Sequence, residues 1–291
     1  MNYYVYWKQT PTGRYQDDIG LRYDVSVITE PEYNLKPDVE KSKYKLHWAK
    51  DRFTELAGLK ELFPGRHEHN VFQSSMFQIP EKKATEIAVI LTTWKRIDRL
   101  EETLRQIQDQ TFKDFDLYVI NNNPSLTGEI NEVISRFSMN ITLYHSRANL
   151  GFINRHLLAK ELAASYPFII MLDDDLDIKK NAFSVLNSEK KKKTIKSILA
   201  LNFKSFFYDQ QEEKEAKPSK YVGPGGMICD SSLFLIPEFW SEWELEYYLI
   251  DDFWVSYFAG KLGWECGKSL APMILKTDGD DGVKTYKKNA V

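Results

Sequence analysis

The stretch FIIMLDDDLD, residues 168–177, decides how the chain folds. The apolar run 168–172 is typical of a buried strand, and it leads directly into Asp173, Asp174 and Asp175. Three adjacent carboxylates at the end of a buried strand repel one another, so they indicate a nearby positive charge. A divalent cation with oxygen ligands supplies that charge most simply. The alternative for this cluster alone is an acidic loop that caps the next helix.

Three similar units precede this strand. Apolar runs at 87–91, 115–120 and 141–144 predict strands, and amphipathic stretches after them predict helices, the first opened by a capping box of Asp98 and Glu101. Strands alternating with helices indicate an α/β fold with a mostly parallel sheet. Ligands bind at the carboxyl ends of such strands. We therefore expect one crevice that gathers the strand-ending residues Thr92, Asn121, Asn149 and Asp173.

The flanking regions are less regular. Residues 1–84 are interpreted as an N-terminal extension without regular structure, except for a helix at about 41–63. Residues 85–291 are interpreted as one domain, with a ligand-binding half to about 177 and a second half from 178. In that second half we expect a strand at 197–203, a backbone-exposing loop at 223–226, a helix at 251–262 and a strand at 270–275.

The composition excludes several classes of protein. The net charge is −3, from 39 basic and 42 acidic residues, so no overall field attracts nucleic acid. The two cysteines, Cys229 and Cys266, fit a reducing, cytoplasmic setting. Apolar runs fall short of the ~20 residues that a spanning helix needs. We therefore expect no transmembrane segment, whereas peripheral membrane association and the oligomeric state are left open.

Several motifs together resemble a known family. Residues 89–94, the turn at 121–124, the segment 149–155 and the run 169–175 resemble the successive nucleotide-sugar elements of GT-A glycosyltransferases of the family 2 type, in the same order. The resemblance extends over about 87–275. It implies the GT-A fold, a Rossmann-like sheet flanked by helices. It also implies sugar transfer from a nucleotide diphosphate-sugar, UDP favoured over GDP, to a hydroxyl of a glycan or another acceptor.

The resemblance assigns the donor and metal sites. Asp173 and Asp175 correspond to the Asp-x-Asp pair of the family, which implies Mn²⁺ or Mg²⁺ as the cofactor. Taken singly these signals are weak, because an Asn-rich turn is more often only a turn and Arg155 is more often a surface residue. The implied donor-binding residues are Thr92, Thr93, Asn121, Asn122, Asn149, Gly151, Arg155, Asp173 and Asp174.

The acceptor side is assigned in the same way. Gly225 and Gly226 correspond to the family's acceptor loop, and Trp254 is expected beside it. Asp251 and Asp252 correspond to the acidic pair that opens a late helix. One of them, with Asp252 preferred, would be the general base of an inverting transfer. Their other interpretation is as N-terminal capping residues of that helix.

One feature departs from the family pattern. Many members supply a late histidine to the metal or the diphosphate, but all five histidines of this chain precede the Asp cluster. The acidic tail at 278–281, or Lys276 or Lys284, would have to replace it. His67-Glu68-His69 also looks like a metal motif, but an isolated pair of this kind is equally typical of a surface loop.

Two other functions compete with glycosyl transfer. Residues 175–178, DLDI, resemble the nucleophile motif of haloacid-dehalogenase-type phosphatases, in which Asp175 would form an aspartyl-phosphate. Against this, that motif usually opens its domain, whereas three strand–helix units precede it here. The chain could also be a non-catalytic sugar- or nucleotide-binding domain, since fold does not fix function. Donor hydrolysis that depends on Mn²⁺ separates the enzyme from the binding domain.

Overall fold

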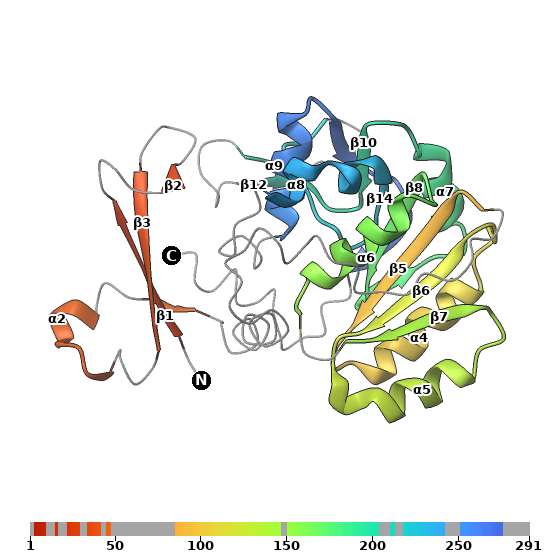
Figure 1. The fold of residues 1–291 in the computed structure, drawn as a ribbon, viewed down its shortest axis with the longest axis horizontal. Helices are drawn as coiled ribbons and strands as arrows, with labels where there is room; N and C mark the ends of the chain where they lie inside the picture. Colours follow the sequence, from red (N-terminus) through yellow and green to blue (C-terminus); the bar gives the residue numbers. More distant parts are fainter. Residues whose placement is uncertain are drawn as a thin grey trace.

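The structure is a computed structural model, and Figure 1 shows its fold as a ribbon. The residues that it describes are 3–9, 15–16, 22–29, 34–41, 45–47, 85–146, 150–203, 210–212, 218–241 and 251–275. Asn149, His67, His69 and the tail from residue 276 lie outside these ranges.

The N-terminal region contains an antiparallel sheet, so the prediction that it lacks regular structure is wrong. Its strands run in the order β2-β3-β1-β4, beside the short helix α2 (Asp38–Lys41). The predicted helix at 41–63 is also wrong where the structure describes it, because Lys45–His47 forms strand β4. The other strands are β1 (Tyr3–Gln9), β2 (Tyr15–Gln16) and β3 (Arg22–Thr29).

A seven-stranded sheet forms the centre of the α/β part, as Figure 1 shows. Its order is β15-β10-β14-β8-β5-β6-β7. Strands β8, β5, β6 and β7 are parallel neighbours, whereas β14 is antiparallel to both β8 and β10. The prediction of a mostly parallel α/β sheet is therefore confirmed. The bounds are β5 (Ile87–Thr93), β6 (Asp116–Asn121), β7 (Ile141–His145), β8 (Phe168–Asp173), β10 (Thr194–Ser197), β14 (Met227–Asp230) and β15 (Glu265–Lys268).

Helices cover both faces of this sheet, which explains why the central strands β5 and β8 are apolar over most of their length. Along β5, Ile87, Val89 and Leu91 pack into the core on one face, and Ala88 and Ile90 pack into the core on the other. Burying each of the larger side chains contributes roughly 1.5–3 kcal/mol. One face is covered by α4 (Ile97–Gln108), α5 (Thr127–Ser135) and α7 (Ala182–Glu189); the other by α6 (Ile153–Ala163), η2 (Ser231–Leu235), α8 (Pro237–Ser241) and α9 (Asp251–Lys261).

Two local predictions are wrong. Helix α4 begins at Ile97 after Arg96, which makes no side-chain capping bond, so the predicted capping box of Asp98 and Glu101 does not form. The predicted strand at 197–203 is two strands, because the Ser197 hydroxyl accepts a hydrogen bond from the Leu199 amide at 3.1 Å and turns the backbone.

Short strands complete the second half of the domain. β11 pairs with β12 and β13, and β16 pairs with β9, in both cases antiparallel. Their bounds are β9 (Leu176–Ile178), β11 (Ala200–Phe203), β12 (Gln210–Glu212), β13 (Tyr221–Val222) and β16 (Met273–Leu275), and a 3-10 turn η1 (Pro124–Leu126) follows β6. Within the described ranges, no helix combines the length and apolar character needed to cross a membrane.

Candidate functional site

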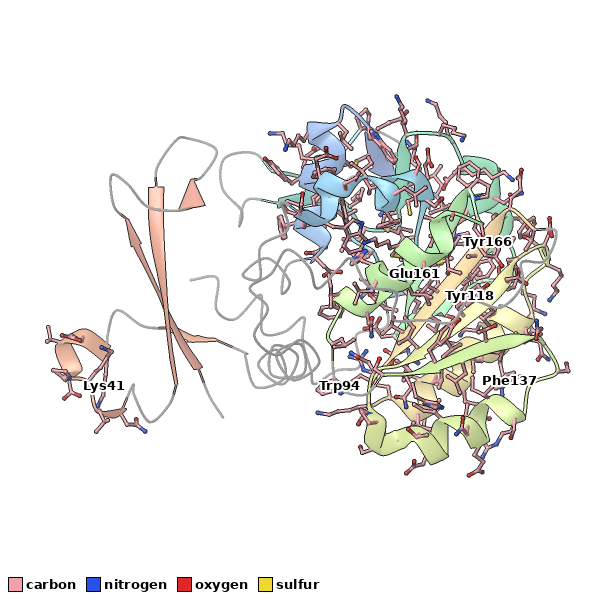
Figure 2. All side chains as sticks on the ribbon, in the orientation of Figure 1. Lys41, Trp94, Tyr118, Phe137, Glu161 and Tyr166 are labelled. Carbon is pink, nitrogen blue, oxygen red and sulfur yellow. The ribbon has the colours of Figure 1, made fainter. Side chains whose placement is uncertain are left out.

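The strand ends meet at one edge of the sheet, as the sequence predicts. In the strand register, Thr92 lies opposite Asp173 and Thr93 lies opposite Asn121. Figure 2 shows Trp94, which follows β5, at this edge, and Tyr166, which precedes β8, toward the opposite edge. The parallel strands therefore deliver Thr92, Asn121 and Asp173 to a common carboxyl edge.

The middle carboxylate of the acidic turn points into the protein. Asp174 is buried, and it accepts hydrogen bonds from the Thr93 hydroxyl at 2.8 Å and from Arg96 at 3.1 Å. Burial raises the pKa of Asp174 even though both of these bonds favour the charged form. Asp174 and Thr93 therefore tie β5 to the acidic turn, and their contact with the donor stays a prediction.

Asp175 has one carboxylate oxygen available for a ligand. Its Oδ2 accepts a hydrogen bond from Arg96 at 3.0 Å, whereas its Oδ1 is buried and has no hydrogen-bond partner. Burial, reinforced by the nearby charge of Asp173, raises the pKa of Asp175 to about 6. An unsatisfied carboxylate oxygen in a turn with a second carboxylate is a fitting ligand for a hard cation.

The protein itself supplies an incomplete metal site. Within the described residues, no three histidine, cysteine, aspartate or glutamate side chains converge on one point. A cation held by Asp173 and Asp175 would therefore need other ligands, and Mg²⁺ sites commonly take these from water and phosphate. The residues fit a cation that arrives with a diphosphate.

Asp173 begins a chain of ionic contacts that crosses from the sheet to α9. The Arg155 guanidinium donates a hydrogen bond to Asp173 Oδ1 at 2.7 Å, and its Nε lies 3.9 Å from Asp251 Oδ2. Burial alone would lower the pKa of Arg155, but the charges of Asp173 and Asp251 outweigh it and raise that pKa. Arg155 is buried, with only 2% of its side chain exposed, so the interpretation as a surface residue is wrong.

The two acids that open α9 have different surroundings. Asp251 is only 4% exposed, and its Oδ2 lies 2.8 Å from Nε2 of the fully buried His156. Asp252 is half-buried; it accepts hydrogen bonds from the Tyr221 hydroxyl at 2.5 Å and from the Phe253 amide at 2.8 Å. Of the two acids, Asp252 is therefore the more accessible, and the assignment of a general base to this pair stays a prediction.

The glycine loop between β13 and β14 lies against the acidic turn. A Cβ atom built on Gly225 would lie 2.3 Å from Asp173 Oδ2, so only glycine permits this approach. Gly226 has φ +78°, a left-handed conformation that favours glycine, and its amide donates to the Met171 carbonyl at 2.9 Å. The loop predicted to serve the acceptor is therefore adjacent to the carboxylates predicted to serve the metal.

Trp254 is mostly buried in an aromatic cluster. It is 7% exposed, donates from Nε1 to the Phe239 carbonyl at 3.1 Å, and packs against the rings of Phe239 and Phe258. Its predicted contact with the acceptor stays a prediction.

The side chains of the asparagine-rich turn form hydrogen bonds with backbone groups and with His145. The Asn122 side chain accepts from the Leu150 amide at 2.9 Å and donates to the Gly151 carbonyl at 3.1 Å. Asn121 is fully buried, with its amide bonded to His145 and its oxygen bonded to the Asn123 amide. Both side chains are thus engaged within the protein, and the expectation that one of them faces the nucleobase stays a prediction.

Sequence reasoning gave no role to three residues of this site. Arg96 pairs with Asp174 and Asp175, and its position at the junction of β5 and α4 was a usable signal. Tyr221 and His156 contact the acids of α9 from other elements, and no local pattern points to them.

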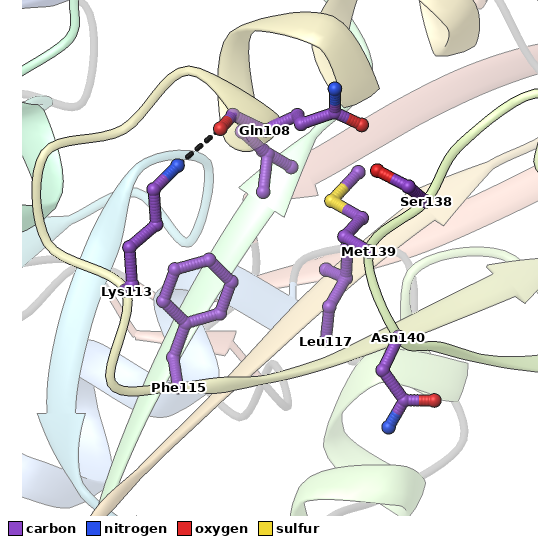
Figure 3. A pocket seen from close by; sticks show the side chains of 8 residues that line it. Gln108, Lys113, Phe115, Leu117, Ser138, Met139 and Asn140 are labelled. Carbon is purple, nitrogen blue, oxygen red and sulfur yellow. Dashed lines mark hydrogen bonds between the residues drawn. The ribbon is translucent and has the colours of Figure 1, made fainter.

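A separate pocket lies at the other edge of the sheet. Its volume is ≈ 300 Å³, and it lies between the end of α4 and the segments that enter β6 and β7. Figure 3 shows Lys113 at its rim, donating to the Gln108 carbonyl, above the rings and chains of Phe115, Leu117 and Met139. Because the acidic turn lies at the carboxyl ends of the strands, this pocket is not part of the site.

Comparison with known proteins finds one family model and several similar structures. Residues 88–221 match the family model described as glycosyl transferase family 2. The crystal structure of GalNAc-T7 with UDP, GalNAc and Mn²⁺ is similar with a TM-score of 0.50 and 12% identity, over 65% of this chain and 43% of that chain. TarS of S. aureus is similar with a TM-score of 0.44 and 17% identity, over 63% and 35%. The chain thus spans less than half the length of either structure, and no curated protein matches it.

Proposed function

Because residues 88–221 match the family 2 glycosyl transferases on a GT-A fold, we propose that the protein transfers a sugar from a nucleotide diphosphate-sugar to an acceptor hydroxyl. The donor is a UDP-sugar, with a GDP-sugar as the alternative, and the acceptor is a glycan or another hydroxyl compound. The proposal rests mainly on the structure of the acidic turn that follows β8. There, Asp175 has a buried oxygen without a hydrogen-bond partner, and Asp173 lies beside Gly225, where a Cβ atom would clash with its carboxylate. We assign this activity to residues 85–291.

Asp173 and Asp175 would hold Mn²⁺ or Mg²⁺. When bound, the cation supplies positive charge that stabilises the leaving diphosphate. GalNAc-T7 was crystallised with Mn²⁺ and UDP on a similar fold, which supports a cation in this chain too. Arg96, beside Asp175, is 47% exposed and can turn toward a phosphate once another cation neutralises the carboxylates.

Asp252 is the general base in this proposal. Its carboxylate would accept the proton of the acceptor hydroxyl as that oxygen attacks the anomeric carbon, with inversion of configuration. The Tyr221 hydroxyl orients Asp252 Oδ2, and the Phe253 amide orients its Oδ1. Such hydrogen bonds hold a carboxylate in one direction, which a base needs in order to meet its proton.

Nucleotide binding and donor hydrolysis test the proposal together. Calorimetry with UDP and with GDP, each with Mn²⁺ and with EDTA, should give metal-dependent binding of one nucleotide. A panel of UDP-glucose, UDP-galactose, UDP-N-acetylglucosamine, UDP-N-acetylgalactosamine and GDP-mannose should then give nucleotide release with water as the acceptor. Binding without release from any donor would favour a non-catalytic binding domain. Hydrolysis of a generic phosphate ester without nucleotide binding would favour a phosphatase.

A further inference from the structure

His156 is a fully buried titratable side chain that the proposed chemistry does not use. It lies on α6, with its ring centroid 5.9 Å from that of Phe234. Its Nε2 atom lies 2.8 Å from Asp251 Oδ2, across 95 residues of sequence. This buried contact joins α6 to α9, two helices that lie far apart in the sequence.

The protonation state of His156 decides which of the two groups donates the hydrogen bond between His156 and Asp251. Burial lowers the pKa of His156, and the neighbouring Arg155 charge adds to this effect, against the opposing influence of Asp251. The ring is therefore neutral near pH 7. A neutral imidazole has one N–H, and a carboxylate only accepts, so Nε2–H donates to Asp251.

Two neighbouring residues of α6 hold Asp251 from the same side. His156 makes the short hydrogen bond, and Arg155 approaches at 3.9 Å while it binds Asp173 at 2.7 Å. The first turn of α9, which contains Asp252, is thus linked through α6 to the acidic turn after β8. On its other side, the Tyr221 hydroxyl donates to the Asp252 carboxylate, and the Tyr221 ring contacts Phe253.

We propose that His156 is a positioning residue, which fixes the first turn of α9 through Asp251 and thereby places Asp252 relative to Asp173. This inference rests on the proposed function, because it takes Asp252 as the base. Without the His156 donor, Asp251 loses its short hydrogen bond to α6, and the first turn of α9 loses one of the contacts that fix its position. A displacement of about 1 Å at a reacting group can cost roughly 10²-fold in rate.

Three substitutions of His156 distinguish the effect of losing the hydrogen bond from the effect of losing the volume of the ring. His156→Leu fills the space without a donor, His156→Gln carries an amide that reaches the Nε2 position, and His156→Asn carries the same amide too short to reach it. The measurements are kcat for UDP release with water as the acceptor and calorimetric affinity for UDP with Mn²⁺. We expect Leu and Asn to lower kcat about 10- to 100-fold, the cost typical of removing a supporting hydrogen bond. Gln should stay within about twofold of the wild type, and all three should bind UDP unchanged.

A double-mutant cycle with Asp252→Asn distinguishes positioning from general stability. If His156 acts through Asp252, then His156→Leu should cost less than about twofold in the Asp252→Asn background, because no base remains to be misplaced. Equal losses in both backgrounds, or a loss confined to UDP affinity, would overturn the inference. If the Leu variant does not fold, the Asn and Gln variants carry the same comparison. A wild type that neither binds UDP nor releases it would instead refute the proposed function itself.

Discussion

Replacing Gly225 with alanine should weaken nucleotide binding without unfolding the protein. The new Cβ would lie 2.3 Å from Asp173 Oδ2 and 3.0 Å from its Cγ, so the carboxylate must rotate away. That rotation breaks the 2.7 Å hydrogen bond from the buried Arg155 guanidinium. A hydrogen bond between charged groups contributes about 1.5–3 kcal/mol, which corresponds to roughly 10- to 100-fold in affinity if Asp173 serves the donor site.

The assay is calorimetry with UDP and Mn²⁺, alongside urea unfolding. Gly260→Ala is the matched control, because a Cβ on Gly260 in α9 would meet no atom within 4 Å. This control should bind UDP as the wild type does and gain up to about 1 kcal/mol of stability, since alanine favours a helix over glycine. Wild-type affinity in the Gly225→Ala variant would refute the placement of Asp173 in the donor site.

Three further predictions follow from the surroundings of single residues. Asp175→Asn should abolish Mn²⁺-dependent UDP binding with the fold intact, because it removes the unsatisfied carboxylate oxygen; unchanged affinity and metal dependence in calorimetry would contradict it. Asp252→Asn should lower kcat by about 10²–10⁴-fold while sparing UDP affinity, and product NMR should give inverted anomeric configuration; full activity or retention would remove Asp252 from the mechanism. His156 should make the protein acid-sensitive, because its folded pKa lies below 6.5 and the unfolded chain then binds the extra proton. The free energy of unfolding should therefore fall as pH drops below ~6.5, by at most about 1.4 kcal/mol per pH unit, and His156→Gln should lose this part of the slope in urea titrations.

The central strands were predictable because burial on both faces requires apolar residues at successive positions. Every position of β6 is buried, as are six of the seven positions of β5, and each strand contains a continuous apolar run, 117–120 in β6 and 87–91 in β5. The N-terminal sheet escaped prediction for a related reason. Strand β1 has the sequence YYVYWKQ, rich in aromatic residues but without polar alternation, and it pairs with β3 through distant residues such as Tyr3 and Thr29. Enrichment in tyrosine and valine was the signal that should have indicated a strand.

The site was only partly predictable, because the same residue types serve both ligands and turns. Asn121 and Asn122 follow a strand, as donor-binding residues do, yet both use their side chains to hold neighbouring backbone. The acidic turn was recognisable because its carboxylates are adjacent in sequence and their repulsion is local. The structure is needed to see which arginine pairs with which carboxylate, Arg96 with Asp175 and Arg155 with Asp173.

Helix geometry explains why one acid of the pair at the start of α9 is buried while the other remains accessible. Successive residues of an α-helix project about 100° apart, so Asp251 and Asp252 cannot face the same surroundings. Asp251 turns toward His156 and Arg155 on α6, and Asp252 turns toward Tyr221 on β13. The buried acid can then hold the helix while its neighbour stays partly exposed for chemistry. The partners of each carboxylate thus separate a buried acid, Asp251, from a more exposed one, Asp252, which is why we propose Asp252 and not Asp251 as the base.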